Sequence, residues 1–497
     1  MSGHAELLAE IGSYCKQHRM AESTFGRLAV NDGKLVARLR DGKSVTLNTL
    51  ERLRTFMRSE PGGNGPANGN AKGKGNARGN GAGTRTEKEA AAMAHASRKT
   101  KKTAKTLSQA GLADPDPGAA ESGEGSQNFR FFDNRQKYLM FVNTCSEKWV
   151  VANRVAMELA HIHPKPPAVR IFDAGLGDGT VLTRLMRAMH ARFPTMPHYI
   201  SGKEISLEDI RLALEKMPDR FHEHPASVLV LTNMYYSEAP WLRVRSPAAA
   251  ASLVWHEVAL EGDSSFDFEE QITALQPFLA EHWQAKASEK TGNPIYERPV
   301  VLVIYRRDHK FLLDSVIPKP GATGADFDLI IASQPYRLRV PAEFKANKVV
   351  APLARALGPG GRLVGIHSHG NDPGLEIVQK VWPDEQPYIN DRHDILKAVK
   401  DILGSTNRDL KYNSYSDARS VFRYDMHTLP NELAGAIGTS TLFAAWNAAI
   451  YVAQIEDSRL SDVVKDGRYI DATAEVLRKH GGLWFNDETY VISRKQA

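Results

Sequence analysis

The sequence predicts an α/β protein with a doubly wound sheet, preceded by a small all-α domain and a disordered linker. Residues 169–189 read as a short apolar strand, a glycine-rich loop and an amphipathic helix, and a second strand ends in an acid at Glu204. Residues 61–83 are mainly Gly, Asn and Ala, a composition that cannot bury enough apolar surface to fold. Residues 5–57 carry short apolar stripes at helical spacing.

These composition changes divide the chain into three parts. We expect a helical domain over 1–59, a basic Gly/Asn/Ala-rich disordered linker over 60–127 and an α/β domain over 128–497. Asp114-Pro-Asp-Pro117 cannot continue a helix and marks a stop before the last domain.

The N-terminal domain contains two short predicted helices, 21–30 and 34–40, joined at Asn31-Asp-Gly33. The run from Thr24 to Gly42 resembles the repressor-type helix-turn-helix, which implies that its second helix enters the major groove of DNA. The basic residues that would face DNA are Lys34, Arg38 and Arg40. The alternative is a small helical adaptor whose arginines are merely solvated. Specific recognition by so small a unit would call for a homodimer.

The basic excess of the chain lies entirely in its first part. Residues 1–127 carry 20 Lys+Arg against 13 Asp+Glu, whereas the remaining 370 residues carry 44 against 45. The cluster 98–105 would contact nucleic acid phosphates in a salt-dependent way, and a plain soluble tether is the competing interpretation.

Cysteine usage and hydropathy indicate a cytoplasmic protein. The two cysteines, Cys15 and Cys145, fall in different predicted domains, so no disulfide framework or cysteine metal site is expected. The N-terminus lacks a basic and apolar signal pattern, and no apolar run is long enough to span a membrane.

The glycine loop and two acids form the predicted ligand site. Gly175 and Gly177 let the backbone approach a ligand closely, and the loop aims a helix N-terminus at it. Asp173, at the end of the strand, would repel a pyrophosphate and suits a cationic ligand. Glu204 occupies the position where a doubly wound sheet places the carboxylate that holds ribose hydroxyls.

Asp173-Ala-Gly-Leu-Gly-Asp-Gly-Thr180 together with Glu204 resembles the class I S-adenosylmethionine-dependent methyltransferases. The resemblance implies a Rossmann-like sheet, S-adenosylmethionine as cofactor, and Asp173, Gly175, Gly177 and Glu204 as cofactor-binding residues. It also implies an adenine contact at the end of the third strand, where Asn233 offers a donor and an acceptor. In this family the helix before the first strand forms part of the substrate mouth, which would place there Phe131, Phe132 and Tyr138. Plain core packing is the alternative, and we favour it for at least two of the three.

The fourth strand departs from the family pattern. The favoured candidate, Phe327–Ser333, follows the third strand by more than 90 residues, with strand-like runs at 252–260 and 300–305 between them. Either an insertion at about 237–325 decorates the sheet near the substrate mouth, or one of these runs is the true fourth strand. The apolar runs 441–455 and 483–493 are expected to supply the last two strands, paired antiparallel as the resemblance implies.

The favoured fourth strand leads into Ser333-Gln-Pro-Tyr336, which resembles the Asn/Asp/Ser-Pro-Pro-Tyr/Phe loop of amino-methyltransferases with Gln334 in place of the first proline. A conjugated amino nitrogen is a poor nucleophile. A side-chain oxygen and a backbone carbonyl that accept its hydrogens would aim its lone pair, and a tyrosine ring would stack on the target. Ser333 and Tyr336 are therefore the predicted catalytic residues, with a strand-end turn as the structural alternative.

His367 and His369 follow at the end of the predicted fifth strand, where ligands collect in open α/β sheets. A histidine there would accept a substrate proton. No third ligand is evident near this pair, so no metal site is predicted.

The sequence thus predicts a methyltransferase that acts on an amino nitrogen. The acceptor stays open among nucleic acid, protein and small molecules, and the basic N-terminal part favours nucleic acid. The alternative is a DNA-binding transcriptional regulator that retains a non-catalytic S-adenosylmethionine-binding domain.

Overall fold

The computed structural model describes residues 2–18, 20–30, 32–40, 53, 56–57, 135–289, 293–321, 324–427 and 437–496. The chain divides into two units, Met1–Ser108 and Gln109–Ala497, and each is described by itself. The predicted linker, most of residues 41–57, and the aromatic residues Phe131 and Phe132 lie outside the described residues.

The described part of the N-terminal unit contains the helices α1 (Ser2–Gln17), α2 (Glu22–Val30) and α3 (Leu35–Arg40). Its core includes Ile11 and Phe25, both fully buried. The two helices predicted on either side of Asn31-Asp-Gly33 therefore form. Arg38 pairs with Asp32, and Arg40 pairs with Glu22, at exposed positions where ion pairs add little stability. DNA contact by this unit stays a prediction.

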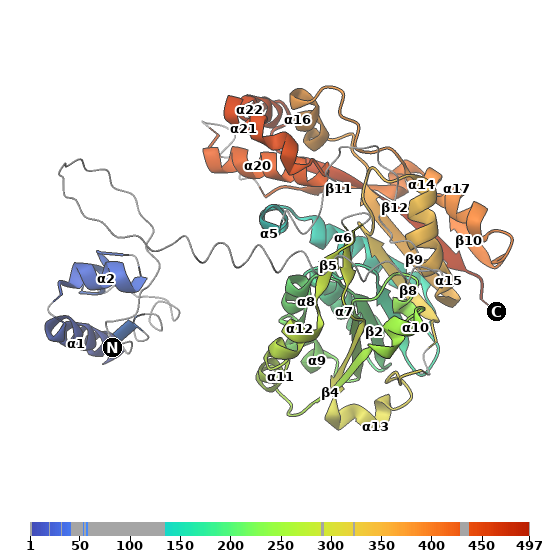
Figure 1. Ribbon diagram of the computed structural model, residues 1–497, viewed down its shortest axis with the longest axis horizontal. Coiled ribbons are helices and arrows are strands. Elements are labelled where there is room, and N and C mark those ends of the chain that lie inside the picture. Colours follow the sequence, from blue (N-terminus) through green and yellow to red (C-terminus); the bar gives the residue numbers. More distant parts are fainter. Residues whose placement is uncertain are drawn as a thin grey trace, which may run out of the picture. The chain divides into compact units, whose positions relative to one another are not determined.

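The second unit is built on a ten-stranded sheet (Figure 1). Its path runs β10-β12-β9-β8-β1-β2-β3-β7-β4, and β11 pairs with β12. The strands are β1 (Val169–Asp173), β2 (His198–Lys203), β3 (Ser227–Thr232), β4 (Val254–Leu260), β7 (Val300–Arg306), β8 (Phe327–Ser333), β9 (Leu357–Ser368), β10 (Leu410–Asn413), β11 (Val421–Asp425) and β12 (Trp484–Arg494).

The five central strands are parallel, and their order shows a Rossmann-like doubly wound fold. From β1 the chain proceeds to β2 and β3 on one side, and it then returns to build β8 and β9 on the other. The predicted fourth strand is thus confirmed as β8, because it pairs in parallel with β1 through Asp173 and Ile331. The reversal of strand order between β1 and β8 opens a crevice at their carboxyl ends.

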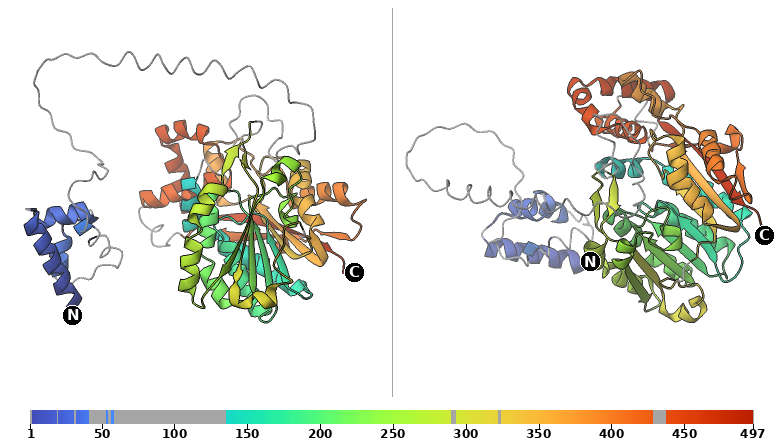
Figure 2. Two further views of the ribbon diagram at one scale, coloured as in Figure 1. Left: turned by 60° about the horizontal axis from the view of Figure 1, so that its bottom comes forward. Right: turned by 45° about the vertical axis from the view of Figure 1, so that its right-hand side comes forward.

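Helices cover both faces of the sheet (Figure 2). Successive β1 residues alternate between the faces, so that Ile171 joins one core cluster and Phe172 the other. On the Ile171 face lie α6 (Glu147–Ala156), η1 (Met157–His161), α7 (Thr180–Arg192), α8 (Leu207–Leu214), α9 (Pro218–Glu223), α11 (Ser265–Thr273) and α12 (Gln276–His282). On the Phe172 face lie η2 (Ala239–Trp241), α13 (Lys310–Leu313), α14 (Ala342–Lys345), η4 (Ala346–Val350), α15 (Ala351–Arg355) and α17 (Arg392–Leu403).

The long segment between β3 and β8 extends the sheet rather than supplying its fourth strand. β7 pairs antiparallel with β3, and β4 continues beyond β7 as the edge strand. The same segment contributes α10 (Pro247–Ala251), η3 (Arg307–His309) and a separate hairpin of β5 (Ala285–Ala287) and β6 (Pro294–Tyr296).

A helical layer packs around the C-terminal end of β11 and the N-terminal end of β12 (Figure 1). It contains α5 (Arg135–Thr144), α16 (Pro373–Val381), α20 (Thr439–Val452) and α22 (Arg468–His480), and the short elements nearby in sequence are α18 (Asp417–Ser420), η5 (Asp457–Arg459) and α21 (Leu460–Asp466).

The prediction of a strand over 441–455 is wrong, because this run forms α20 and the remaining sheet position is taken by β10. The run is rich in alanine, the best helix former, and its Ala445, Trp446 and Ala449 are buried in the helical layer. A buried helix shows no polar face, so its sequence resembles that of a buried strand. Within the described ranges no helix is long and apolar enough to cross a membrane.

Candidate functional site

A cavity of about 370 Å³ lies where the central strands end. Its walls come from the glycine loop after β1, the segments that follow β2, β3 and β8, the β5–β6 hairpin, and the helices α5, α6, α14, η4 and α20. Elements from the whole second unit therefore converge on the crevice that the strand order creates.

The glycine loop forms part of the cavity wall. Gly175 and Gly177 both line the cavity, and Gly177 has a left-handed φ of 53° that glycine adopts without strain. Asp173 does not line it. The residue is 2% exposed, and its carboxylate accepts a hydrogen bond from the Gly175 amide at 3.2 Å. Burial raises the pKa of Asp173 to about 6. Asp173 thus shapes the loop, and its contact with a cationic ligand stays a prediction.

Glu204 links the first two strand ends. One carboxylate oxygen accepts the amides of Ile205 and Ser206, each at 2.8 Å, and the other accepts the amide of Gly177 at 2.8 Å. Burial raises its pKa, and the nearby Asp209 adds to this effect. A carboxylate offers roughly four acceptor positions, so Glu204 retains capacity for a ligand hydroxyl at the cavity wall.

Asn233 lies outside the cavity wall, although it was predicted to contact adenine. Its side-chain amide donates to the Arg298 carbonyl at 3.0 Å and accepts the Val300 amide at 2.8 Å. Only 1% of the residue is exposed. Both of its polar functions therefore hold the start of β7 in place, and its contact with adenine stays a prediction.

The loop after β8 lines the cavity with Ser333, Gln334, Pro335 and Tyr336. Its backbone differs from that of a Pro-Pro loop, because Gln334 has a φ of 48° and proline is confined near −65°. The Pro335 carbonyl accepts the Tyr236 hydroxyl at 3.0 Å. The Tyr336 hydroxyl lies 3.3 Å from that of Tyr490. Resemblance to the amino-methyltransferase loop thus holds for the residue types at 333 and 336 but not for the backbone between them.

A hydrogen-bond network beneath this loop holds the strained residue. The backbone N–H of Gln334 donates to the Ile366 carbonyl at 2.8 Å. The side-chain amide of Gln334 donates to the Ser368 hydroxyl at 3.1 Å and to the Asp487 carboxylate at 3.3 Å. Asp487 is fully buried, and burial raises its pKa well above the usual value. The surrounding sheet therefore stabilises a backbone conformation that side-chain-bearing residues seldom adopt.

Several wall residues were not predicted as site residues. Tyr138 was predicted at the mouth and does line the cavity, whereas the unpredicted residues include Lys148, Lys203, Tyr235, Tyr236, Asn293, Phe344 and Tyr451. Tyr235 and Tyr236 lie in the segment that follows β3, so their position near a strand end was a usable signal. Tyr451 belongs to α20, and no local pattern places it at the cavity.

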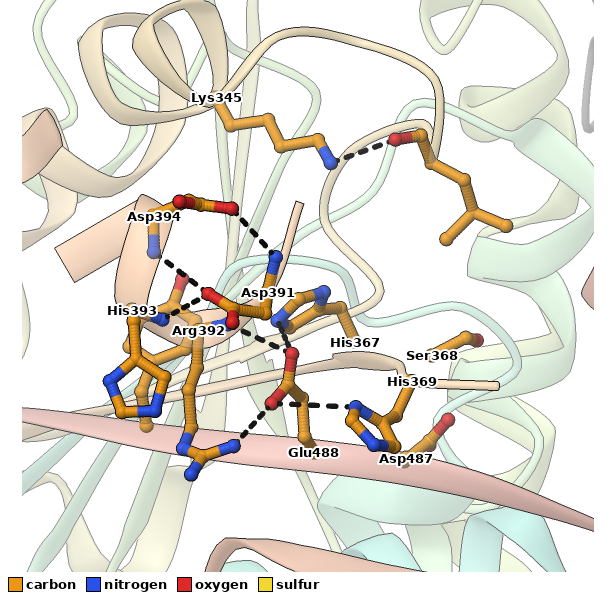
Figure 3. Close-up of polar contacts among 12 residues, drawn as sticks. Lys345, His367, Ser368, His369, Asp391, Arg392, His393, Asp394, Asp487 and Glu488 are labelled. Atoms are coloured by element: carbon orange, nitrogen blue, oxygen red, sulfur yellow. Dashed lines mark hydrogen bonds and ion pairs between the residues drawn. The ribbon is translucent and has the colours of Figure 1, made fainter. Parts of the chain in front are cut away.

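His367 and His369 lie away from the cavity wall, in the cluster shown in Figure 3. Glu488 lies 3.2 Å from the His367 ring, 3.6 Å from that of His369 and 2.8 Å from the Arg392 guanidinium. Burial raises the pKa of Glu488, but the contacts with the two histidines and with Arg392 outweigh it and hold this pKa below its usual range. The contact with Glu488 in turn raises the pKa of His369. The cluster ties β9, β12 and α17 together, and it does not provide the predicted proton acceptor at the cavity. Among the described side chains no His, Cys, Asp and Glu group could hold a metal.

No family model matches this chain, and neither does any curated protein. Similar solved structures include the [4+2]-cyclase SpnF, at 11% identity and a TM-score of 0.26 over 70% of this chain and 80% of that one. Geranyl diphosphate methyltransferase in complex with GPP and sinefungin has 12% identity and a TM-score of 0.26 over 69% and 78%. An rRNA methyltransferase from Streptomyces viridochromogenes has 15% identity and a TM-score of 0.19 over 51% and 82%. These similarities are distant, so the strand order itself defines the fold as Rossmann-like and doubly wound.

Proposed function

We propose that this protein is an S-adenosylmethionine-dependent methyltransferase. The observation that carries the proposal is the convergence of Gly175, Gly177, Glu204, Ser333 and Tyr336 on one cavity at the switch point of the sheet. These residues come from three strand ends far apart in sequence, and they match the pattern that suggested the family.

The cavity fits this cofactor in two respects. Gly175 and Gly177 line the cavity and carry no Cβ atoms that would keep a ligand from their backbone. Glu204 lies in the wall with acceptor capacity left for a ribose hydroxyl. Tyrosine rings from α5, α20 and the end of β3 provide surfaces on which a cationic or planar group packs favourably.

The bound cofactor would supply a methyl group activated on a sulfonium. The chain would bind and orient the acceptor and exclude water, since an in-line displacement depends mainly on positioning. The Ser333 hydroxyl would accept a hydrogen bond from an amino group of the acceptor. The Tyr336 ring would stack against the planar group that bears this amino nitrogen. The burial of Tyr336 and its contact with Tyr490 would keep that ring in place.

A nucleic acid acceptor agrees with the basic excess of residues 1–127, with the N-terminal unit then acting as a targeting device. One assay distinguishes a nucleic acid acceptor from a protein acceptor and from a small-molecule acceptor. Conversion of S-adenosylmethionine to S-adenosylhomocysteine in fractionated lysate would be sensitive to nuclease for a nucleic acid acceptor, and to protease for a protein acceptor. Turnover that survives both treatments indicates a small molecule.

Calorimetric titration with S-adenosylhomocysteine tests the cofactor assignment. Glu204→Gln should weaken binding by roughly tenfold or more, because it removes a charged acceptor from the cavity. Glu215→Gln, at an exposed position that ends α8, is the matched control and should leave affinity unchanged. Failure of the wild-type protein to bind the nucleoside would refute the proposal.

The alternative is a DNA-binding regulator with a non-catalytic cofactor domain. It predicts the same nucleoside binding but no transfer of labelled methyl to any lysate fraction. Methyl transfer that is lost with Ser333→Ala, while nucleoside affinity is kept, would exclude this alternative.

A further inference from the structure

One lysine in the cavity wall differs from the other cations around it. The Lys148 ammonium lies 3.6 Å from the Glu147 carboxylate, and the Arg337 guanidinium donates to Asn293. Lys203 also lines the cavity, yet no hydrogen bond or ion pair joins its ammonium to any residue that the structure describes.

The surroundings of Lys203 stabilise its charge only in part. Its ammonium lies 4.8 Å from the centre of the Tyr236 ring, an attractive cation–π contact that leaves the three N–H donors unsatisfied. The adjacent Glu204 also lines the cavity, and its negative charge offsets part of the cost of burying this ammonium, although no ion pair joins the two side chains. Burial lowers the pKa of Lys203 more than the charge of Glu204 raises it.

An anion in the cavity would supply the missing partner. A partly buried cation without hydrogen bonds is costly, and a carboxylate would satisfy its donors and offset the loss of hydration. Tyr236 lies beside this lysine, and Phe344 and Val349 are among the other aromatic and apolar residues of the cavity wall. The acids of the wall are Glu204, Glu208 and Asp209. Such a wall favours a ligand that combines a flat or apolar body with one negative group.

We propose that Lys203 is the residue that binds a carboxylate of the ligand in this cavity. Two sources would present this chemistry: the amino-acid end of the cofactor, or an acceptor molecule that carries an acid. This inference rests on the proposed function for the first source, whereas the second is independent of it.

The test compares Lys203→Met, which keeps the length of the side chain, with Lys397→Met on the exposed face of α17. Each protein is titrated calorimetrically with S-adenosylhomocysteine, with 5′-methylthioadenosine, which lacks the amino-acid carboxylate, and with the pair benzoate and benzamide. Lys203→Arg is included as the conservative variant, and thermal unfolding verifies that all variants are folded.

A loss of about tenfold in S-adenosylhomocysteine affinity, with methylthioadenosine binding unchanged, assigns the lysine to the cofactor carboxylate. A loss of benzoate binding, with both nucleosides and benzamide unaffected, assigns it to an acidic acceptor. In either case Lys203→Arg should restore binding in part and Lys397→Met should behave as the wild type.

If Lys203→Met changes neither S-adenosylhomocysteine nor benzoate affinity, the inference is wrong. The same conclusion follows if methylthioadenosine and benzamide lose as much affinity as their charged counterparts, since the defect then does not depend on the carboxylate. A wild-type protein that binds benzoate but neither nucleoside would refute the proposed function while leaving Lys203 as an anion-binding residue.

Discussion

The pH dependence of stability is expected to centre on His198, the first residue of β2. Its side chain is fully buried, and its ring stacks on that of His224 with the centroids 3.6 Å apart. Neither ring nitrogen has a hydrogen-bond partner within the described residues. Burial, helped by the charge of His224, lowers the pKa of His198 to about 3. The fold therefore accommodates only the neutral ring.

The sign and size of the effect follow from proton linkage. The unfolded chain binds a proton at this histidine below pH 6.5, whereas the folded chain does not until about pH 3. Stability is thus fully present above pH 6.5 and is lost as the pH falls towards 3, at about 1.4 kcal/mol per pH unit. Between pH 6.5 and pH 5 the loss from His198 should be about 2 kcal/mol.

Urea unfolding at pH 8, 6.5 and 5 measures this loss directly. His198→Phe keeps a flat ring for the stack and removes the titrating group. Between pH 6.5 and 5 the free energy of unfolding of this variant should therefore fall by about 2 kcal/mol less than that of the wild type. His163→Phe, at an exposed site, is the control and should follow the wild type. Identical pH slopes for the wild type and His198→Phe would refute this reasoning.

Three further substitutions separate folding from ligand binding. Gly175→Ala should change the free energy of unfolding by less than about 1 kcal/mol, because the nearest atom to the new Cβ is 3.7 Å away. Calorimetry should nevertheless show roughly tenfold weaker S-adenosylhomocysteine binding, because Gly175 lines the cavity. Unchanged affinity would contradict this prediction. Gly179→Ala should cost about 2–3 kcal/mol in urea unfolding, since its φ is 76° and its Cβ would lie 2.9 Å from Ala213 atoms. Asn233→Ala should cost about 1–3 kcal/mol by leaving the buried Val300 amide and the Arg298 carbonyl without their side-chain partner, and equal nucleoside affinity would distinguish this structural role from the predicted adenine contact.

The sequence was informative at the ends of β1, β2 and β8. Gly175, Gly177 and Glu204 were predicted from the loop and acid that follow β1 and β2, and parallel strands bring such positions together at one edge. Ser333 and Tyr336 were predicted from the residues after β8, and both line the same cavity. Local patterns suffice here because each element carries its own periodicity and its own stop signal.

Other features depended on which elements pack against each other. The fully apolar run at 441–455 did not distinguish a buried helix from a buried strand, and packing in the helical layer decided for α20. Asn233 has the residue type expected of a base contact, but β7 pairs alongside β3 and uses both of its amide functions. The conformation at Gln334 likewise depends on Ser368 and Asp487 from two other strands.

The sequence by itself determined the order of the strands and helices around the glycine loop, and hence the edge of the sheet at which a ligand would bind. Only the tertiary structure decided which side chains complete the cavity, including Tyr451 from α20 and the lysine at the end of β2 that lacks a described ion-pair partner. The physical reason is the range of the interactions involved. Periodicity and turn chemistry act over a few neighbouring residues, whereas burial, ion pairing and hydrogen-bond satisfaction depend on segments hundreds of residues apart.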